Sequence, residues 1–277
     1  MSSFYEELAE ILEIEPDQVT PDLKLEDTSW DSLAVVSTIA LIDEQYDEAV
    51  SADALTSCET VGDIERLIAA GAARTVLLLT ADTYSKFIHP GDKSVRTLFG
   101  DGAAATLVVA DPTGEASVGP FVFGTDGAGG KDLIVDAGGF RTPRGPDTRL
   151  VVEDNQGNSR SREHLFMHGA NVMNFSLREV PRTFAKLLAL SGATAAEVDH
   201  VVLHQANKFM LDALQRKLGL PPEKVPRRYE DVGNTVSSTI PFVLADLQRN
   251  GQMAPGTRIA VVGFGVGLSW AGAMVTC

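Results

Sequence analysis

The sequence predicts two modules of different fold class: a small all-α bundle in residues 1–70 and a layered α/β region in residues 71–277. Two observations lead to this prediction. Residues 1–70 hold 18 acidic side chains against 2 basic ones, whereas residues 71–277 hold 21 basic and 20 acidic side chains. The pattern also changes near Arg74, from helical spacing of apolar residues to glycine-rich turns and short apolar runs. This asymmetry indicates two modules with different roles.

The composition narrows the class of protein. No apolar run approaches the ~20 residues of a membrane span, and the acidic start MSSFYEELAEILEIEP lacks the basic region of a signal peptide. The two cysteines, Cys58 and Cys277, have no metal-like spacing. We therefore expect a cytoplasmic protein without structural disulfides or a bound metal. The acidic module would repel nucleic acid and favour basic protein surfaces.

Three main helices and one short helical turn are expected in residues 1–70. The first helix has an apolar face made of Phe4, Leu8, Ile11 and Leu12. After a loop rich in Pro and Asp, the second begins near Asp31 and is expected to turn inward Leu33, Val36, Ala40 and Leu41. Its far end carries Asp43, Glu44, Asp47 and Glu48. The last helix starts at Thr60 and is expected to bury Val61, Ile64, Leu67 and Ile68.

The stretch WDSLAVV enters the second helix, and here residues 1–70 resemble an acyl carrier protein. Asp31, Ser32 and Leu33 match its attachment motif, so the resemblance implies 4′-phosphopantetheine on Ser32 and a phosphopantetheinyl transferase as a partner. A serine at a helix N-terminus, beside free backbone N–H groups and the positive end of the dipole, suits a phosphate. Alternatively, Asp31 and Ser32 only cap the helix. In this family the acidic second helix is the docking surface for basic enzymes.

Strands and helices alternate in the second module. TVLLLTADT reads as a strand buried on both faces, and LFGDGAAATLVVAD as a turn followed by a strand. After a loop-rich stretch comes a helical segment interrupted by Pro181, which is either one kinked helix or two. VDHVVLHQAN reads as a buried strand that ends on His204. A helix, the segment VGNTVSSTIPFVLADLQRNG and the strands TRIAVVGFG and LSWAGAMVT follow.

Four motifs in order, LFGDGAAA, HQAN, GNTVSSTIP and GFGVGLSWAGA, make residues 72–277 similar to the β-ketoacyl-ACP synthase III group of the thiolase fold. The resemblance implies a thiolase-like αβαβα architecture, of which the chain holds the C-terminal portion. Residues 71–125 match the end of the first thiolase half and residues 160–277 the second half. The small four-helix acyl-carrier bundle precedes them.

In that family a cysteine takes an acyl group from a thioester, and a carbanion formed by decarboxylation of a malonyl thioester attacks it. The resemblance gives His204 and Asn234 the role of donating hydrogen bonds to the thioester oxygen that becomes the enolate. A neutral imidazole and an amide can do this without a competing charge. His204 alone is more often a core histidine, and its pairing with GNTVSSTIP supports the functional interpretation. The other histidines, His89, His164, His168 and His200, are expected to be structural or on the surface.

Two further features follow from the same resemblance. The turn at Gly265, Val266 and Gly267 would supply a backbone N–H to an oxyanion hole, and Val266 replaces a glycine common there, which makes an unusual acyl substrate plausible. The helix after HQAN would meet the acidic carrier through Lys208, Arg216 and Lys217. For each of these cations an ordinary solvated helix face is an equal alternative.

The nucleophile is missing from the pattern. The family cysteine lies at the N-terminus of a helix just before the strand that matches RTVLLLTAD, and here that position belongs to the last carrier helix. Cys58 is expected in an exposed, acidic turn that raises its pKa, and Cys277 is the last residue. LIAAGAART, without a linker, reads equally well as the end of either helix. A split synthase, a truncated or spliced gene or fusion, and a module that has lost condensation are all compatible with this.

We therefore predict an acyl carrier joined to a synthase III-like acyltransferase region for decarboxylative condensation in fatty acid or polyketide-type biosynthesis, with the cysteine supplied in trans. Substrates would be acyl-CoA or acyl-ACP and a malonyl thioester. One alternative is acyl transfer to an alcohol or amine, with His204 as general base; another is a non-catalytic carrier and docking scaffold. A half-removed fold would expose apolar strands, so we expect a homo- or hetero-oligomer with a thiolase-fold subunit.

Overall fold

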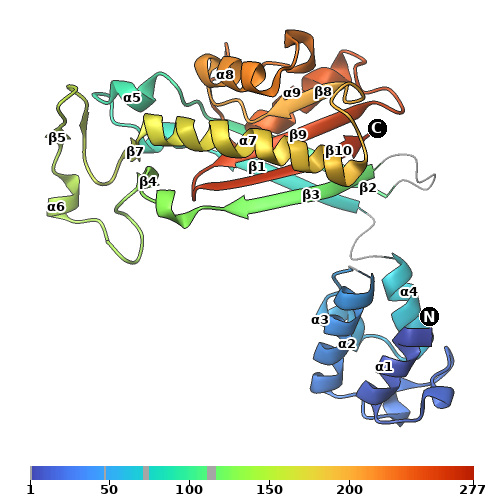
Figure 1. Cartoon of the computed structure of the whole chain (residues 1–277). Helices are drawn as coiled ribbons and strands as arrows, with labels where there is room; N and C mark the ends of the chain where they lie inside the picture. Colours follow the sequence, from blue (N-terminus) through green and yellow to red (C-terminus); the bar gives the residue numbers. More distant parts are fainter. Residues whose placement is uncertain (1, 47, 71–74, 111–116) are drawn as a thin grey trace. The chain divides into compact units, whose positions relative to one another are not determined.

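A computed structural model of the chain describes residues 2–46, 48–70, 75–110 and 117–277. It contains two compact units (Figure 1). The N-terminal unit comprises Met1–Val76 and Leu107–Ala110, and the C-terminal unit comprises Leu77–Thr106 and Asp111–Cys277. The module boundary expected after residue 70, most of the junction GAART, and Asp47 lie outside the described residues.

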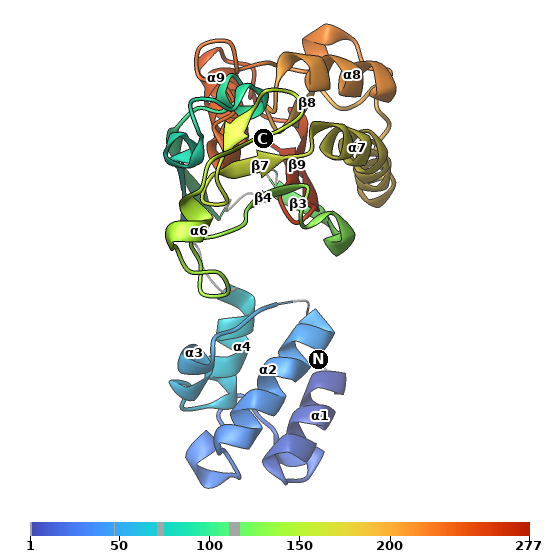
Figure 2. The same cartoon turned by 90° about the vertical axis from the view of Figure 1, so that its left-hand side faces the viewer.

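The N-terminal unit is a helical bundle (Figure 2). Its helices are α1 (Ser2–Leu12), α2 (Ser32–Tyr46), α3 (Ala52–Thr56) and α4 (Val61–Ala70). Short 3-10 turns lie in the loop between α1 and α2, at η1 (Pro16–Gln18) and η2 (Leu25–Asp27). The fully buried side chains of its core include Leu8, Leu12, Leu25, Ile42, Leu55 and Ile64. The faces predicted for α1 and α4 thus contribute to one core.

The predicted inward face of α2 was mostly wrong. Leu33 and Val36 are 71% and 61% exposed, and Ala40 is also exposed, whereas Leu41 is buried as predicted. The residues that α2 buries are Ala34, Val35, Thr38, Leu41 and Ile42. Because the first half of this helix has apolar residues on several sides, its sequence pattern could not select the inward face.

The C-terminal unit is built on a four-stranded sheet with the order β3-β10-β9-β8. The strands are β3 (Ser117–Thr125), β8 (His200–Leu203), β9 (Arg258–Gly265) and β10 (Ser269–Thr276). β8 and β9 are parallel, with Leu203 opposite Val262, and the other pairs are antiparallel. The side chains of β8 and β9 are mostly buried, so these two strands form the middle of the unit's core.

Helices cover both faces of this sheet. α7 (Gly169–Ser191) and α8 (Lys208–Leu218) share one core with Val201 and Leu203, whereas α9 (Thr239–Arg249) packs against Val202 on the opposite face. β8 is therefore buried on both faces, which confirms the buried strand predicted before His204. α7 is a single helix with Pro181 inside it (Figure 1).

Smaller elements surround this frame. They are η3 (Tyr84–Phe87), α5 (Lys93–Arg96), η4 (Gly127–Gly129), β4 (Leu133–Val135), α6 (Pro146–Arg149), β5 (Val152–Glu153), β6 (Ser159–Arg160), β7 (Leu165–Met167), η5 (Pro222–Lys224) and η6 (Val236–Ser238). β4 pairs with β7 and β5 with β6. None of the helices in the described part of the chain has the length and apolar character that crossing a bilayer requires.

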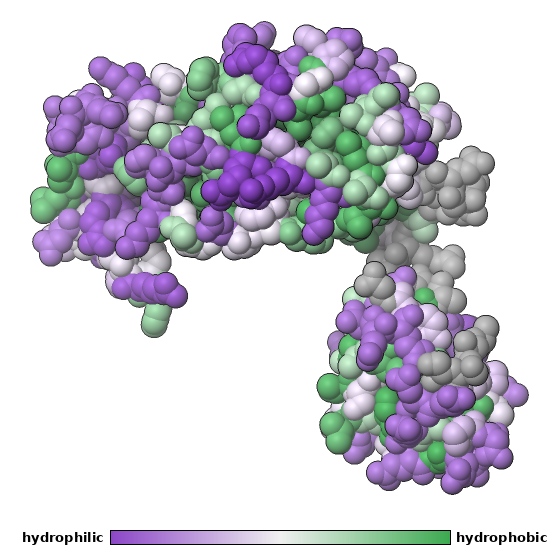
Figure 3. Space-filling view, viewed as in Figure 1, coloured by the Kyte–Doolittle hydropathy of each residue, from purple (hydrophilic) through white to green (hydrophobic). Residues whose placement is uncertain are grey.

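A separate two-stranded sheet is formed by β1 (Thr75–Asp82) and β2 (Gly102–Val109). The prediction that β1 is buried on both faces was wrong: Leu77, Leu78 and Leu79 are 58%, 51% and 68% exposed. Successive residues of a strand point to opposite faces, so neither face of β1 is covered by a layer of the residues that the structure describes. The space-filling view shows apolar surface beside hydrophilic surface on this unit (Figure 3). The predicted strand TVLLLTADT is therefore present as β1, but its predicted burial is not.

Candidate functional site

His204 follows the last residue of β8, and both its backbone and its imidazole ring have hydrogen-bond partners. Its backbone N–H donates to Val262 O of β9 at 2.9 Å, and its Nδ1 lies 2.8 Å from the Thr239 hydroxyl oxygen at the start of α9. The Phe264 ring meets the imidazole edge to face at 5.3 Å. Burial lowers the pKa of His204 to about 4, against a smaller opposing effect of the Val236 backbone. The imidazole is therefore neutral at neutral pH, as the sequence analysis supposed.

Asn234 is held by a segment more than 130 residues earlier in the chain. Its backbone N–H donates to Leu98 O at 2.8 Å, and its carbonyl oxygen accepts from Gly100 N–H at 2.9 Å. A Cβ on Gly100 would lie 2.0 Å from Val232 O, so only glycine allows this approach. The backbone of Leu98 and Gly100, within LFGDG, thus fixes the loop that carries Asn234, and we call this pair of contacts the clamp on Asn234.

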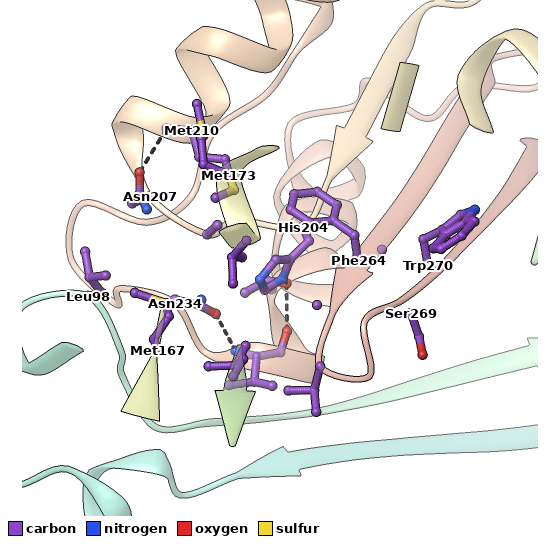
Figure 4. A pocket seen from close by; sticks show the side chains of 18 of the residues that line it. Leu98, Met167, Met173, His204, Asn207, Met210, Asn234, Phe264, Ser269 and Trp270 are labelled. Atoms are coloured by element: carbon purple, nitrogen blue, oxygen red, sulfur yellow. Dashed lines mark hydrogen bonds between the residues drawn. The ribbon is translucent and has the colours of Figure 1, made fainter. Parts of the chain in front are cut away.

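The orientation of the Asn234 amide is fixed as well. Its Oδ1 accepts from Val236 N–H at 2.9 Å, and therefore Nδ2 faces away from that contact and can donate to a ligand. His204 and Asn234 both line a cavity of about 930 Å³ (Figure 4). Apolar side chains form most of its wall, among them Met167, Met173, Met210, Phe264 and Trp270. The structure brings the predicted pair together in a site suited to an apolar chain.

The predicted oxyanion turn borders the same cavity. Gly265 ends β9, and Gly265 and Val266 both line the cavity. Val266 is 52% exposed, so its side chain occupies space at the cavity surface that a glycine would leave open. Gly267 has φ of +135°, which favours glycine, but does not border the cavity.

The three predicted docking cations lie on α8, Lys208 at its first residue and Arg216 and Lys217 in its last turn. Lys208 is paired with Asp212 at 2.7 Å but remains 72% exposed, and Arg216 and Lys217 are exposed in the last turn. Beside Lys208, Phe209 is 72% exposed and lines the cavity. The start of the helix therefore presents one cation, Lys208, beside an exposed aromatic side chain of the cavity wall, whereas Arg216 and Lys217 lie at its other end.

Ser32 begins α2 and is exposed, without a side-chain hydrogen bond among the described residues. Asp31 is the residue that caps the helix: its Oδ1 accepts from Leu33 N–H at 2.8 Å and Ala34 N–H at 2.9 Å. The expectation of free backbone N–H groups beside Ser32 was thus partly wrong, because the Asp31 carboxylate occupies two of them. The exposed hydroxyl is nevertheless accessible to a modifying enzyme, so the site fits a covalent arm that extends into solvent.

Neither cysteine lines the cavity. Cys58 is half-buried rather than exposed, and burial first, then the Asp63 carboxylate, raises its pKa. Cys277 packs against the core cluster around α9, and burial raises its pKa too. A raised pKa reduces the thiolate fraction that a nucleophile needs.

The remaining histidines form other contacts. His89 and His164 stack edge to face at 4.9 Å, His168 caps α7 and His200 opens β8. Among the described residues, no cluster of His, Cys, Asp and Glu is arranged to hold a metal ion. The sequence analysis missed Thr239 and Val236, although GNTVSSTIP contains both.

Comparisons with known protein families agree with this layout. The family described as phosphopantetheine attachment site matches residues 3–68. The families described as 3-oxoacyl-[acyl-carrier-protein] synthase III and its C terminal match residues 56–127 and 188–277. The first two matches overlap over residues 56–68, a segment that contains Cys58.

Individual proteins give the same result. A β-ketoacyl-[acyl-carrier-protein] synthase III of Streptomyces coelicolor is 33% identical over 76% of this chain and 60% of its own length. One of Lactococcus lactis is 30% identical over 93% of this chain and 75% of its own length. A crystal structure of a 3-oxoacyl-(acyl-carrier-protein) synthase III is 57% identical, with a TM-score of 0.72, over 74% of this chain and 61% of that one. The chain spans about 60% of the length of the first of these relatives.

Proposed function

The chain belongs to the β-ketoacyl-[acyl-carrier-protein] synthase III family and begins with a phosphopantetheine attachment domain; from this premise we propose that it joins an acyl carrier to the enolate-stabilising part of a condensing enzyme. The carrier domain would be residues 1–70 and the synthase region residues 71–277. The single observation that supports this most is that His204 and Asn234 border one apolar cavity.

The proposed reaction uses these two side chains on a malonyl thioester. Loss of CO₂ breaks a carbon–carbon bond and leaves its electron pair on the α-carbon, shared with the thioester oxygen as an enolate. Asn234 Nδ2, and His204 when Nε2 carries a proton, would donate to that oxygen in a site with little water. The carbanion would then attack the carbonyl carbon of an acyl group held as a thioester on a cysteine. A carbon–carbon bond forms, the carbon–sulfur bond breaks, and the cysteine leaves as a thiolate. The carbonyl oxygen of that acyl group would sit at the Gly265–Gly267 turn.

That cysteine is proposed to come from another polypeptide. Both thiols of this chain have raised pKa values and lie outside the cavity wall. The bare faces of β1 are the surface that a thiolase-fold subunit would cover. The rival source within the chain is Cys58, because the synthase family match begins at residue 56.

The 4′-phosphopantetheine arm is proposed on Ser32, supplied from CoA by a phosphopantetheinyl transferase. Intact-mass spectrometry after incubation with both should show one added group on the wild-type chain and none on Ser32→Ala. Ser29→Ala, which changes a nearby serine outside the motif, should load normally. Loading of Ser32→Ala would contradict the assignment.

Condensation is tested by adding a polypeptide that carries the missing synthase portion. We expect CO₂ release from a malonyl thioester only when both chains are present, and less of it with Asn234→Ala. An acylated alcohol or amine without CO₂ release would instead support simple acyl transfer, which the neutral His204 would serve as a base. Failure of the two chains to associate would favour the non-catalytic scaffold.

A further inference from the structure

The backbone of Val236 contacts the supports of both site side chains. Its N–H donates to Asn234 Oδ1, and its carbonyl oxygen accepts from the Thr239 hydroxyl, each at 2.9 Å. Val236 has φ of +55°, a left-handed conformation that a β-branched residue rarely adopts. Such conformations persist where the surrounding structure enforces them, and they concentrate at functional sites. One peptide segment therefore orients Asn234 directly and His204 through Thr239.

The Thr239 hydroxyl has a single hydrogen and two neighbours that could receive it. Its oxygen lies 2.9 Å from Val236 O and 2.8 Å from His204 Nδ1. If the hydrogen points to Val236 O, then Nδ1–H of His204 donates to the hydroxyl oxygen and both contacts are hydrogen bonds. If the hydrogen points to Nδ1, only that contact is a hydrogen bond. Thr239 is 1% exposed, so bulk water does not replace the lost bond.

We infer that Val236 and Thr239 are positioning residues that hold neutral His204 with its proton on Nδ1 and present an unprotonated Nε2 to the cavity. Asn234 presents Nδ2, a donor, to the same cavity. The resting site therefore offers one acceptor and one donor, where the sequence analysis expected two donors.

The chemical use of this arrangement rests on the proposed function. A thiol of a partner polypeptide would pass its proton to Nε2 and become a thiolate. The thiolate forms a carbon–sulfur bond to the acyl carbonyl, the carbon–sulfur bond of the incoming thioester breaks, and the departing thiolate takes the proton back from Nε2. His204 would donate to an enolate oxygen only while Nε2 is protonated, whereas Asn234 can donate throughout.

The position of the proton can be measured without any turnover. Long-range ¹H–¹⁵N NMR of the full-length ¹⁵N-labelled chain at neutral pH distinguishes protonated from unprotonated ring nitrogens, and the chain has five histidines. The signals of His204 are assigned by their absence in His204→Gln. We expect a protonated Nδ1 and an unprotonated Nε2. A wild-type spectrum with the proton on Nε2 overturns the inference, whether or not the chain proves to be an enzyme.

Variants test the two positioning residues. Thr239→Val removes the hydroxyl with little change of shape and should move the proton to Nε2 in most molecules, whereas Thr239→Ser should restore the wild-type pattern. Val236→Gly keeps both backbone groups in a conformation that glycine adopts freely, so it should retain the wild-type pattern. The unchanged signals of His89 and His164 report an intact fold. A folded Thr239→Val chain with the wild-type pattern contradicts the role of the hydroxyl, and a Thr239→Val chain that does not fold leaves the wild-type spectrum as the deciding result.

Discussion

The two units bury their apolar residues very differently. In the N-terminal unit, Leu8, Leu12 and Ile64 are fully buried in a core formed by short helices. In the C-terminal unit, the sheet around β8 is covered on both faces, but Leu77 and Leu79 of β1 are more than half exposed. The N-terminal unit therefore encloses its core, whereas the C-terminal unit encloses the sheet around β8 but leaves β1 exposed.

The largest expected contrast comes from the same substitution in each unit. Leu8→Ala, at a fully buried position, should lower the free energy of unfolding of the N-terminal unit by about 2–5 kcal/mol. Leu79→Ala, at a 68% exposed position, should change the stability of the isolated chain by less than about 0.5 kcal/mol. Urea unfolding followed by circular dichroism measures both. A large loss with Leu79→Ala would mean that β1 is already covered.

The second test uses pH and concerns only the C-terminal unit. Burial lowers the pKa of His204 from 6.5 to about 4, so the folded state binds its proton less readily than the unfolded state. This group's contribution to stability is present above pH 6.5 and is lost as pH falls toward 4, by up to about 3 kcal/mol. Unfolding measured at several pH values should show a smaller decline in His204→Gln. If stability declined equally with falling pH in the wild type and in His204→Gln, the imidazole of His204 would be exposed to water in the folded state.

A third test targets the clamp on Asn234. Gly100→Ala forces a Cβ to within 2.0 Å of Val232 O and should destabilise the C-terminal unit by about 1–3 kcal/mol. The matched control is Gly127→Ala, since a Cβ there meets nothing within 4 Å. Thermal unfolding of both variants separates the effect of the close approach from that of adding a methyl group. Equal melting temperatures would argue against the clamp.

The smallest expected effect is on the helix that carries the attachment serine. Asp31→Ala removes the acceptor of the Leu33 and Ala34 N–H groups and should lower the stability of the N-terminal unit by about 1 kcal/mol. Asp31→Asn retains a capping oxygen and should recover most of that loss. If Asp31→Ala were neutral, the cap would not contribute to the carrier fold.

The sequence could predict the features that depend on local patterns, but not those that depend on contacts between distant segments. Local patterns identified the helices of the carrier and the strand before His204, whereas the pairing of HQAN with GNTVSSTIP came from the resemblance to the synthase III family. The inward face of α2 was missed, because Leu33 and Val36 are apolar but exposed. The left-handed φ of Val236 and its link to His204 depend on long-range contacts that no local pattern reports. The exposure of β1 was also missed, because an apolar run such as TVLLLTADT does not report which other elements pack against it.

The proposal that the working thiol comes from another polypeptide is tested most directly by an acyl-transfer experiment on this chain alone. The Ser32→Ala chain, which lacks the proposed attachment hydroxyl, is incubated with acetyl-CoA and examined by intact-mass spectrometry. If no thiol here works with His204, its mass stays unchanged. One added acetyl group that maps to Cys58 or Cys277 and disappears on addition of a malonyl thioester would contradict the account.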